Sequence, residues 1–402
     1  MANSILTIDM ITRKTLEILE NNLVVTRNVN REYDSSFAQE GAKIGTTLRV
    51  RLPDRALVTD GAALSVQDDN EQYTTVTVSS QKHIGVNFTT AEMTMQLDDF
   101  AERVLKPRVS QLAASVDAQV VSDAYKGIYQ SVGTPGTTPA TSLVLLQGHQ
   151  KLSEMATPLS PRYATVNPAA NANLVEGMKG LFNPTDTVSR QFKSGLMGEG
   201  VLGYDEINMS QSIASHTTGD WGTTITSTGT LSTQGQATLP ISFTGSSKTW
   251  KIGDVFTIAN VYSVNPQTRQ STGSLQQFVV TADLTASSTG TLSISPAIYT
   301  SSHALATVDS FPQASAAITM LGSAATVYPQ NLIYHRDAIT FATADLVMPK
   351  QGVVMASRQV HNGISLRIVQ AYDINNDRMP TRIDVLFGSS VIRAPMACRL
   401  WG

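Results

Sequence analysis

Apolar and polar residues from Asn87 to Gln130 follow a helical period over an unusual length. Thr89 followed by Glu92 fits a capping box, which gives partners to two backbone N–H groups at a helix start. The pattern predicts one helix, kinked at Pro107 and about 55 to 60 Å long at ~1.5 Å per residue. The alternative is an ordinary core helix broken in two at Pro107. The apolar stripe consists of Met93, Leu97, Phe100, Val104, Leu105, Val109, Leu112, Val116 and Val120.

A shorter amphipathic helix and a long β-hairpin are predicted before this stretch. The apolar side of the helix consists of Ile8, Ile11, Leu16, Leu19 and Leu23. A period of two over residues 46–52 and 75–79 predicts the arms of the hairpin, and residues 84–88 extend the second arm. Residues 53–73 between the arms are too many for a tight turn and too polar to bury alone. We therefore expect a projecting loop that packs against another molecule.

The composition changes abruptly at Thr217. From there to Val327, Ser, Thr and Gly dominate and charged residues are few. Four strand patterns, at 237–243, 254–264, 277–282 and 291–298, predict a small antiparallel barrel or sandwich, with residues 264–277 as a loop. A flexible linker would lack these apolar clusters. The segment is therefore predicted to be an inserted domain.

Strand patterns return after the insertion. Ile364, Leu366 and Ile368 alternate with polar residues, and so do Ile383, Val385 and Phe387. We expect these strands to complete the sheet of the first domain. The predicted fold class is therefore α+β, with a discontinuous domain that carries an antiparallel β-barrel.

Length and charge narrow the possible functions. A chain of 402 residues has room for two or three domains with their own cores. A net charge of −3 argues against a protein that coats nucleic acid, which needs clustered Lys and Arg. The single cysteine, Cys398, excludes a cysteine-based metal site and suits a reducing compartment. Charged residues within the apolar pattern of residues 1–22 argue against a signal peptide or a membrane span, so we expect a soluble protein made in the cytoplasm.

Residues 198–203 match G-x-G-x-x-G, but no strand pattern precedes them and no helical period follows, so a glycine-rich turn is predicted. No Walker loop, H-E-x-x-H or G-x-S-x-G motif occurs. Asp98, Asp99 and Glu102 fit a solvated helix face better than a metal or general-base site. No metal-ligand spacing relates the six histidines, His83, His149, His216, His303, His335 and His361. No catalytic, cofactor-binding or metal-ligating residue is predicted.

The order of a helix, a projecting hairpin and a long helix resembles the major capsid proteins of tailed phages with the Hong Kong 97 shell fold. The run QKHIGVNFTT at 81–90 and the closing run from Arg378 to Trp401 carry this resemblance. The run from Gly253 to Val280 is similar to the inserted β-barrel of the P-22-like coat protein subfamily. The resemblance covers essentially the whole chain, and it rests on element order and segment character.

The resemblance implies a division of the chain. It implies an N-terminal arm (1–33), an extended E-loop hairpin (34–88), a spine helix with the peripheral domain (89–142), a first axial part (143–216), the inserted barrel (217–327) and a C-terminal axial and peripheral part (328–402). One member of the wider fold links its subunits through Lys and Asn side chains. No matching motif occurs here, so Lys43 and Lys82 are not assigned that role, and the Lys82 ammonium is expected to reach solvent.

The resemblance also implies partners. These are further copies of the chain, as hexamers and pentamers of an icosahedral shell, and scaffolding and portal proteins. The shell would enclose double-stranded DNA without reading its sequence, and would contact no membrane. Two other classes of function fit parts of the sequence. The Ser/Thr/Gly-rich insertion also suits a β-rich surface or tail protein, although a fibre would show repeats and none is visible. An enzyme with a dispersed site is the third class.

Overall fold

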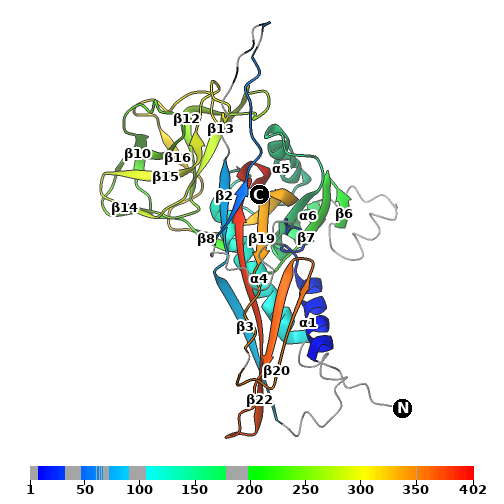
Figure 1. Ribbon diagram of the computed structural model, residues 1–402. Helices are drawn as coiled ribbons and strands as arrows, with labels where there is room; N and C mark the ends of the chain where they lie inside the picture. Colours follow the sequence, from blue (N-terminus) through cyan, green and yellow to red (C-terminus); the bar gives the residue numbers. More distant parts are fainter. Residues whose placement is uncertain are drawn as a thin grey trace. The chain divides into compact units, whose positions relative to one another are not determined.

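The computed structural model describes residues 8–31, 47–59, 61–62, 64, 66, 72–89, 106–177, 198–349 and 351–402 (Figure 1). The chain forms two units, and each is discontinuous in sequence. The first consists of Met1–Val50, Thr74–Val121 and Ile339–Ser390. The second consists of Arg51–Tyr73, Ser122–Ala338 and Val391–Gly402.

The first unit is built on an antiparallel sheet that joins early and late parts of the chain. Its strands are β19 (Ile339–Thr343), β22 (Arg378–Val391), β21 (Ile364–Gln370) and β20 (Met355–His361), in that order, with β3 (Ser80–Thr89) also paired to β22. The predicted strands β21 and β22 are confirmed, and their apolar residues Ile364, Leu366, Ile368, Ile383, Val385 and Phe387 are all buried. Ser365 and Asp384, which alternate with them in the sequence, are buried as well. The strands after the insertion do complete the sheet of the first unit.

Helix α1 (Ile8–Asn22) packs on β20 and β21, because its leucines form one apolar side. Leu16 and Leu19 are buried, as is Leu23 just beyond the helix end. The arms of the predicted hairpin are β1 (Thr47–Arg51) and β2 (Tyr73–Thr77), which pair with each other. The N–H of Leu52 donates to the carbonyl of Gln72 at 2.8 Å, which closes the neck of the projecting segment.

The long helix is shorter at both ends than the sequence predicts. Asn87 to Thr89 belong to β3, where Thr89 pairs with Arg378, so the prediction of a helix from Asn87 is wrong. Pairing along β22 outweighs the helical pattern at these residues. The predicted capping box also needs Glu92, which lies outside the described residues. Helix α4 (Lys106–Gly127) ends before Gln130. Ile128 and Tyr129, which follow the helix, are buried. Residues 90–105, with the first part of the predicted stripe, lie outside the described residues.

Outside its barrel, the second unit contains a mixed sheet with two helices. The strand order is β4 (Ser131–Val132), β23 (Ala397–Leu400), β18 (Asn331–His335), β5 (Arg162–Val166), β7 (Tyr204–Met209) and β6 (Gly198–Val201). Helices α5 (Ser142–Glu154) and α6 (Pro168–Gly177) contribute Leu145, Leu152 and Leu174 to its core. Two short 3₁₀ helices, η4 (Arg336–Ala338) and η5 (Ala394–Met396), flank the late strands.

The inserted segment folds as a nearly closed antiparallel barrel. Its strand order is β16 (Ile318–Met320), β12 (Val255–Val264), β13 (Ser271–Val280), β15 (Thr289–Ile298), β10 (Gln236–Thr244) and β9 (Thr223–Ser227). A bridge between Thr226 and Ala317 links the two ends of this order. A short ladder of β11 (Lys248–Trp250) and β14 (Leu284–Ala286) lies beside it. Because β13 already begins at Ser271, the predicted loop 264–277 is only residues 265–270.

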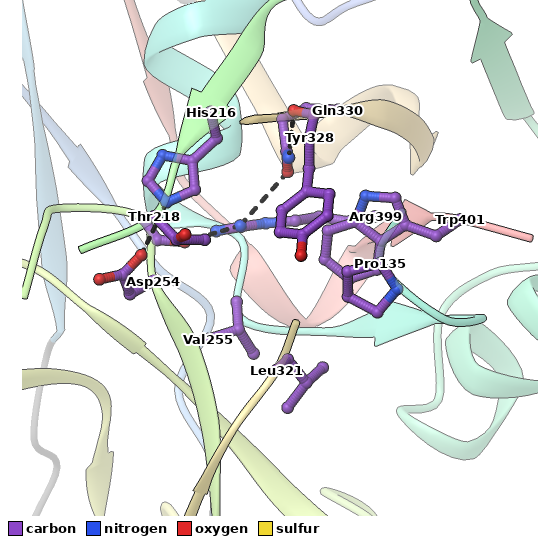
Figure 2. A pocket seen from close by; sticks show the side chains of 11 residues that line it. Pro135, His216, Thr218, Asp254, Val255, Leu321, Tyr328, Gln330, Arg399 and Trp401 are labelled. Carbon is purple, nitrogen blue, oxygen red and sulfur yellow. Dashed lines mark hydrogen bonds and ion pairs between the residues drawn. The ribbon is translucent and has the colours of Figure 1, made fainter. Parts of the chain in front are cut away.

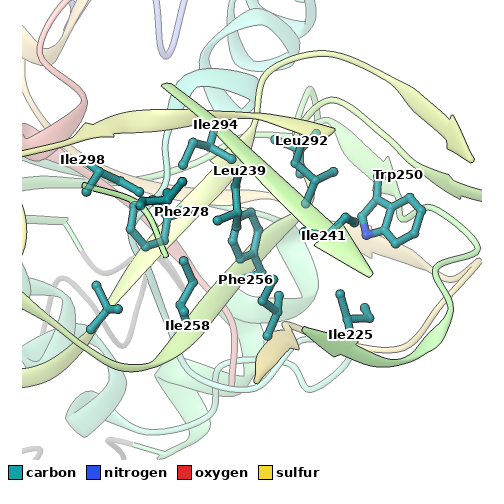
Figure 3. Packing of buried hydrophobic residues seen from close by; sticks show 14 of the residues in the cluster. Ile225, Leu239, Ile241, Trp250, Phe256, Ile258, Phe278, Leu292, Ile294 and Ile298 are labelled. Atoms are coloured by element: carbon teal, nitrogen blue, oxygen red, sulfur yellow. The ribbon is translucent and has the colours of Figure 1, made fainter. Parts of the chain in front are cut away.

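The barrel has an apolar core of its own (Figure 3). The rings of Phe256 and Phe278 stack with centroids 5.7 Å apart, and Phe243 meets Trp250 edge-on at 4.7 Å. Such pairs add to the free energy that burial of their area contributes. The predicted α+β class with an inserted antiparallel β-barrel is therefore confirmed.

Candidate functional site

The inserted barrel leaves and rejoins the rest of its unit through one short ladder. Strand β8 (Ser215–Thr217) pairs antiparallel with β17 (Val327–Pro329), so that Thr217 lies opposite Val327 and His216 opposite Tyr328. Both ends of the insertion are thus held side by side. Most of the buried polar side chains described next surround this ladder, and we call the region the junction.

A buried carboxylate holds two segments together at the junction, residues 216–219 and 251–254. Asp254, just before β12, is 1% exposed. It accepts hydrogen bonds from the N–H groups of Lys251 at 2.8 Å and Gly219 at 3.1 Å. The ring nitrogen Nε2 of His216 lies 2.9 Å from its other oxygen. Because the carboxylate has several donors, its burial away from water is compensated.

Arg399 on β23 provides the opposite charge. Its side chain is 1% exposed, and it donates to the carbonyls of Tyr125, Ile128 and Gly253 at 2.5, 3.0 and 2.7 Å. A fourth hydrogen bond of 3.3 Å goes to the side-chain oxygen of Gln330. The guanidinium also lies over the Tyr125 ring, 5.5 Å from its centroid. Arg399 therefore joins the end of α4, the start of the barrel strand β12 and the returning chain.

Burial governs the electrostatics of this region. It lowers the pKa of Arg399 to about 10, so the guanidinium keeps its charge at neutral pH. Burial also raises the pKa of Tyr125, which Arg399 partly opposes. A cavity of about 10 Å³ lies among these side chains (Figure 2). That is space for about one water molecule and too little for a nucleotide or another organic cofactor.

Two further contacts dock the barrel on the neighbouring sheet and helix. The side-chain amide of Gln277 on β13 accepts from the N–H of Ser131 at 2.7 Å and donates to its carbonyl at 3.1 Å. In the loop 265–270, the Asn265 amide donates to the carbonyl of Glu154, at the end of α5, at 2.6 Å. Tyr129, Val255 and Val279 form a small apolar cluster between them. The barrel is thus fixed by specific polar contacts around a small apolar contact area.

The projecting segment between β1 and β2 has the opposite character. Its described residues contain no helix or strand, and they expose large apolar side chains. Val58, Leu64 and Val66 are 82%, 90% and 83% exposed. Isolated exposed apolar residues are common, but three in one extended segment form a surface suited to contact another molecule.

In the first unit, a second buried carboxylate anchors the chain that follows α1. Asp117 on α4 is 1% exposed and accepts from the N–H groups of Val24 at 2.6 Å, Val25 at 3.4 Å and Thr26 at 3.0 Å. The Thr26 hydroxyl also donates to it. Burial raises the pKa of Asp117, and the four donors oppose that rise. The N-terminal segment is therefore fixed within its own unit by one side chain.

The structure shows where most of the motif-like residues lie. Residues 198–203 form the hairpin between β6 and β7, where Gly200 and Gly203 have φ of 69° and 82°, so the predicted glycine-rich turn is confirmed. Cys398 is buried, and its burial raises the pKa of the thiol to about 12. Asp98, Asp99 and Glu102 lie outside the described residues. Within the described ranges, no three His, Cys, Asp or Glu side chains group as metal ligands.

The contacts of some residues could not be predicted from the sequence. His216 is hydrogen-bonded inside the junction, although no local pattern distinguishes it from the other histidines. The ammonium of Lys82, which is expected to reach solvent, donates at an exposed position to the carbonyl and the hydroxyl of Ser115 at 2.6 and 2.7 Å. Lys43 lies outside the described residues. Among the helices that the structure describes, none is both long and apolar enough to cross a membrane.

The family model for the P22 coat protein, gene protein 5, matches residues 1–402. Comparison with curated proteins finds no match. Among solved structures, the chain is similar to one from Mycobacterium phage Che8, with 10% identity and a TM-score of 0.45 over 94% of this chain and 90% of that chain. It is similar to the capsid of Ralstonia phage GP4, with 9% identity and a TM-score of 0.45 over 93% and 87%. It is also similar to the capsid of cyanophage P-SCSP1u, with 11% identity and a TM-score of 0.41 over 89% of this chain and 84% of that chain.

Proposed function

This chain belongs to the P22 coat protein family, and from that premise we propose that its copies assemble into the icosahedral head of a tailed phage. The chain is a major capsid structural protein, and the resemblance stated from its sequence is confirmed by the family match. The observation that carries the proposal is the extent of that match, which spans residues 1–402 and includes the inserted barrel. The function is geometric, because many identical subunits must tile one closed surface.

The exposed apolar residues of the projecting segment support contact between copies. Burial of such side chains contributes roughly 25 cal/mol per Å² of apolar surface removed from water. Val58, Leu64 and Val66 gain little of this in the single subunit, since each is more than four fifths exposed. A neighbouring copy in the shell would cover them. In a Hong Kong 97-like arrangement this segment is the E-loop and lies over the adjacent subunit.

The domain division stated above completes the proposed arrangement. The arm (1–33), the E-loop (34–88) and the spine and peripheral region (89–142) would make contacts between neighbours. The first axial part (143–216) and the axial portion of 328–402 would meet at the centres of hexamers and pentamers, and the peripheral portion of 328–402 would join the contacts between neighbours. Each subunit would also contain one barrel (217–327), next to these contacts.

Charge supports the proposed contents of the shell. A net charge of −3 suits a wall that encloses double-stranded DNA without binding it tightly. We propose assembly in the host cytoplasm with scaffolding and portal proteins. The buried, unpaired Cys398 is compatible with that reducing compartment.

Electron microscopy of the purified protein tests the proposal. Closed spherical particles are the expected result, formed alone or with a scaffolding protein from the same source. Removal of Asp54 to Glu71 should leave a folded subunit that no longer forms shells, since the described residues of this segment are mostly exposed and the β1–β2 neck closes behind it. The triple variant Val58→Ser, Leu64→Ser and Val66→Ser should show the same loss while keeping the wild-type circular dichroism. Normal particles from both variants would refute a role for this segment in assembly.

A further inference from the structure

Arg399 joins parts of the second unit that are far apart in the sequence. Its partners Tyr125 and Gly253 lie 274 and 146 positions away. We propose that Arg399 is a positioning residue that fixes the orientation of the inserted barrel on the rest of its unit, and that regular shells require this orientation. The second half of the inference rests on the proposed function as a shell subunit, whereas the first half concerns the subunit alone.

The chemistry of the side chain supports this role. A guanidinium carries five N–H donors in a rigid planar fork, so it can bond acceptors in several directions at once. Here it reaches the end of α4, Gly253 at the start of β12 and Gln330 on the returning chain. A lysine has three donors on one nitrogen and cannot span the same acceptors. The geometry therefore requires arginine and not merely a positive charge.

Arg399 lies outside the core of the barrel, so an effect on the orientation of the barrel can be distinguished from an effect on its folding. The barrel core is formed by residues from Ile225 to Ile318 and does not include Arg399. Among the described residues, the apolar contact at the junction includes the small cluster of Tyr129, Val255 and Val279, with Leu321 and Ala394 packed against it. A small apolar contact area permits rotation unless directional bonds prevent it. Loss of Arg399 should thus leave the barrel folded and its attachment loose.

Arg162 provides a matched control within the same unit. It is also fully buried, and its guanidinium also makes several hydrogen bonds. Its partners are His149, Ser153, Thr157 and Pro158, all at the end of α5 or just after it, and none belongs to the barrel. Arg162→Lys should therefore weaken the end of α5, where Asn265 of the barrel also binds the Glu154 carbonyl, but should keep the contacts of the barrel with Arg399 and Ser131.

Hydrogen exchange on the soluble subunit tests the positioning role. One amide reports on the docking: Ser131, which lies outside the barrel and donates to Gln277 on it. In Arg399→Lys and Arg399→Met it should exchange about tenfold faster or more, whereas amides in β10 and β15 should keep wild-type rates. Arg162→Lys should leave the Ser131 amide unchanged. An unchanged Ser131 rate in both Arg399 variants, or equal acceleration in the Arg162 variant, would overturn the positioning role.

Electron microscopy then tests the consequence for assembly. The Arg399 variants should give irregular or broadly sized particles, and Arg162→Lys particles of wild-type size. Uniform particles from an Arg399 variant whose Ser131 amide exchanges faster than in the wild type would overturn the link to assembly. If the wild type forms no particles, the proposed function fails, and the exchange result still decides the role of Arg399.

A variant on the barrel side covers the case in which Arg399 substitutions prevent folding. Gln277→Glu keeps an acceptor for the Ser131 N–H but replaces the donating amide by a carboxylate that repels the Ser131 carbonyl. Because Gln277 is only partly buried on β13, this subunit should fold. It should show the same loosened junction and irregular particles. A wild-type junction and uniform particles in this variant would count against the inference.

Discussion

Among the described residues, the buried charges of Asp117, Asp384, Arg162 and Arg399 each have several hydrogen-bond partners. Asp384 is fully buried between Arg367 and Arg382, whose nitrogens lie 2.5 and 2.6 Å from its oxygens. Asp117 has four donors, and Arg162 and Arg399 each have several acceptors. Removal of one partner leaves a desolvated charge behind, which costs more than the pair contributes. These side chains are therefore the most sensitive single positions in the two units.

Asp117→Asn should destabilise the first unit by about 2 to 4 kcal/mol. The new amide group would face the N–H groups of Val24 and Thr26 and leave at least one of them without an acceptor. Urea denaturation of the subunit measures the loss. Glu17→Gln on α1 is the control, because its pair with Lys14 is more than half exposed and contributes only about 0 to 1 kcal/mol. Equal losses in the two variants would contradict the anchoring role.

Acid should weaken the second unit through His335. Its Nδ1 accepts from the N–H of Asp337 at 3.2 Å, and burial lowers its pKa below the ordinary 6.5, with Asp337 opposing and Arg162 adding to the shift. The unfolded chain therefore takes up the proton first. Stability is complete above about pH 6.5 and falls as the pH drops from there toward the folded pKa. Unfolding free energies between pH 8 and pH 5 should fall less steeply in His335→Asn, and identical slopes would exclude His335 as the cause.

At the scale of elements, the helices and strands that were predicted correctly are those with a local hydrophobic period. The strands of the barrel and strands β21 and β22 follow from a period of two, and α1 from its leucines. The prediction that the helix begins at Asn87 is wrong, because the pairing of β3 with β22 is a contact that no local pattern encodes. Arg399, Asp254 and Asp117 escaped notice for the same reason. In the sequence, none of the three differs from an ordinary surface charge, because their acceptors or donors come from distant parts of the chain.

The barrel should fold as an isolated fragment from Thr217 to Val327, since its core needs no residue from outside this range. Circular dichroism should show β-structure and one cooperative thermal transition. Phe256→Ala should lower the stability of the fragment by about 3 to 5 kcal/mol, because Phe256 is fully buried against Phe278. A fragment without a cooperative transition would show that the barrel depends on its attachment.

At the scale of the whole molecule, particles should hold together without covalent links between chains. An isopeptide bond needs a lysine, an asparagine and a carboxylate placed together away from water. The ammonium of Lys82 is instead bound to Ser115, and the buried thiol of Cys398 has a pKa raised to about 12. Boiled in denaturant without reductant, particles should run as a single band of 43.1 kDa. A ladder of multiples would show that the shell is cross-linked.

The β8–β17 ladder also makes the barrel a replaceable module. Thr217 and Val327 are paired neighbours, and the Cα atoms of such a pair lie about 4.5 to 5.5 Å apart, so a turn of a few residues could close the gap left by the barrel. At this position a chain could gain, lose or exchange a domain without rerouting its other strands. The exchange carries one condition. Without the Gly253 carbonyl, Arg399 would keep a buried charge with one acceptor fewer, so a lineage that lost the barrel would be expected to replace this arginine too.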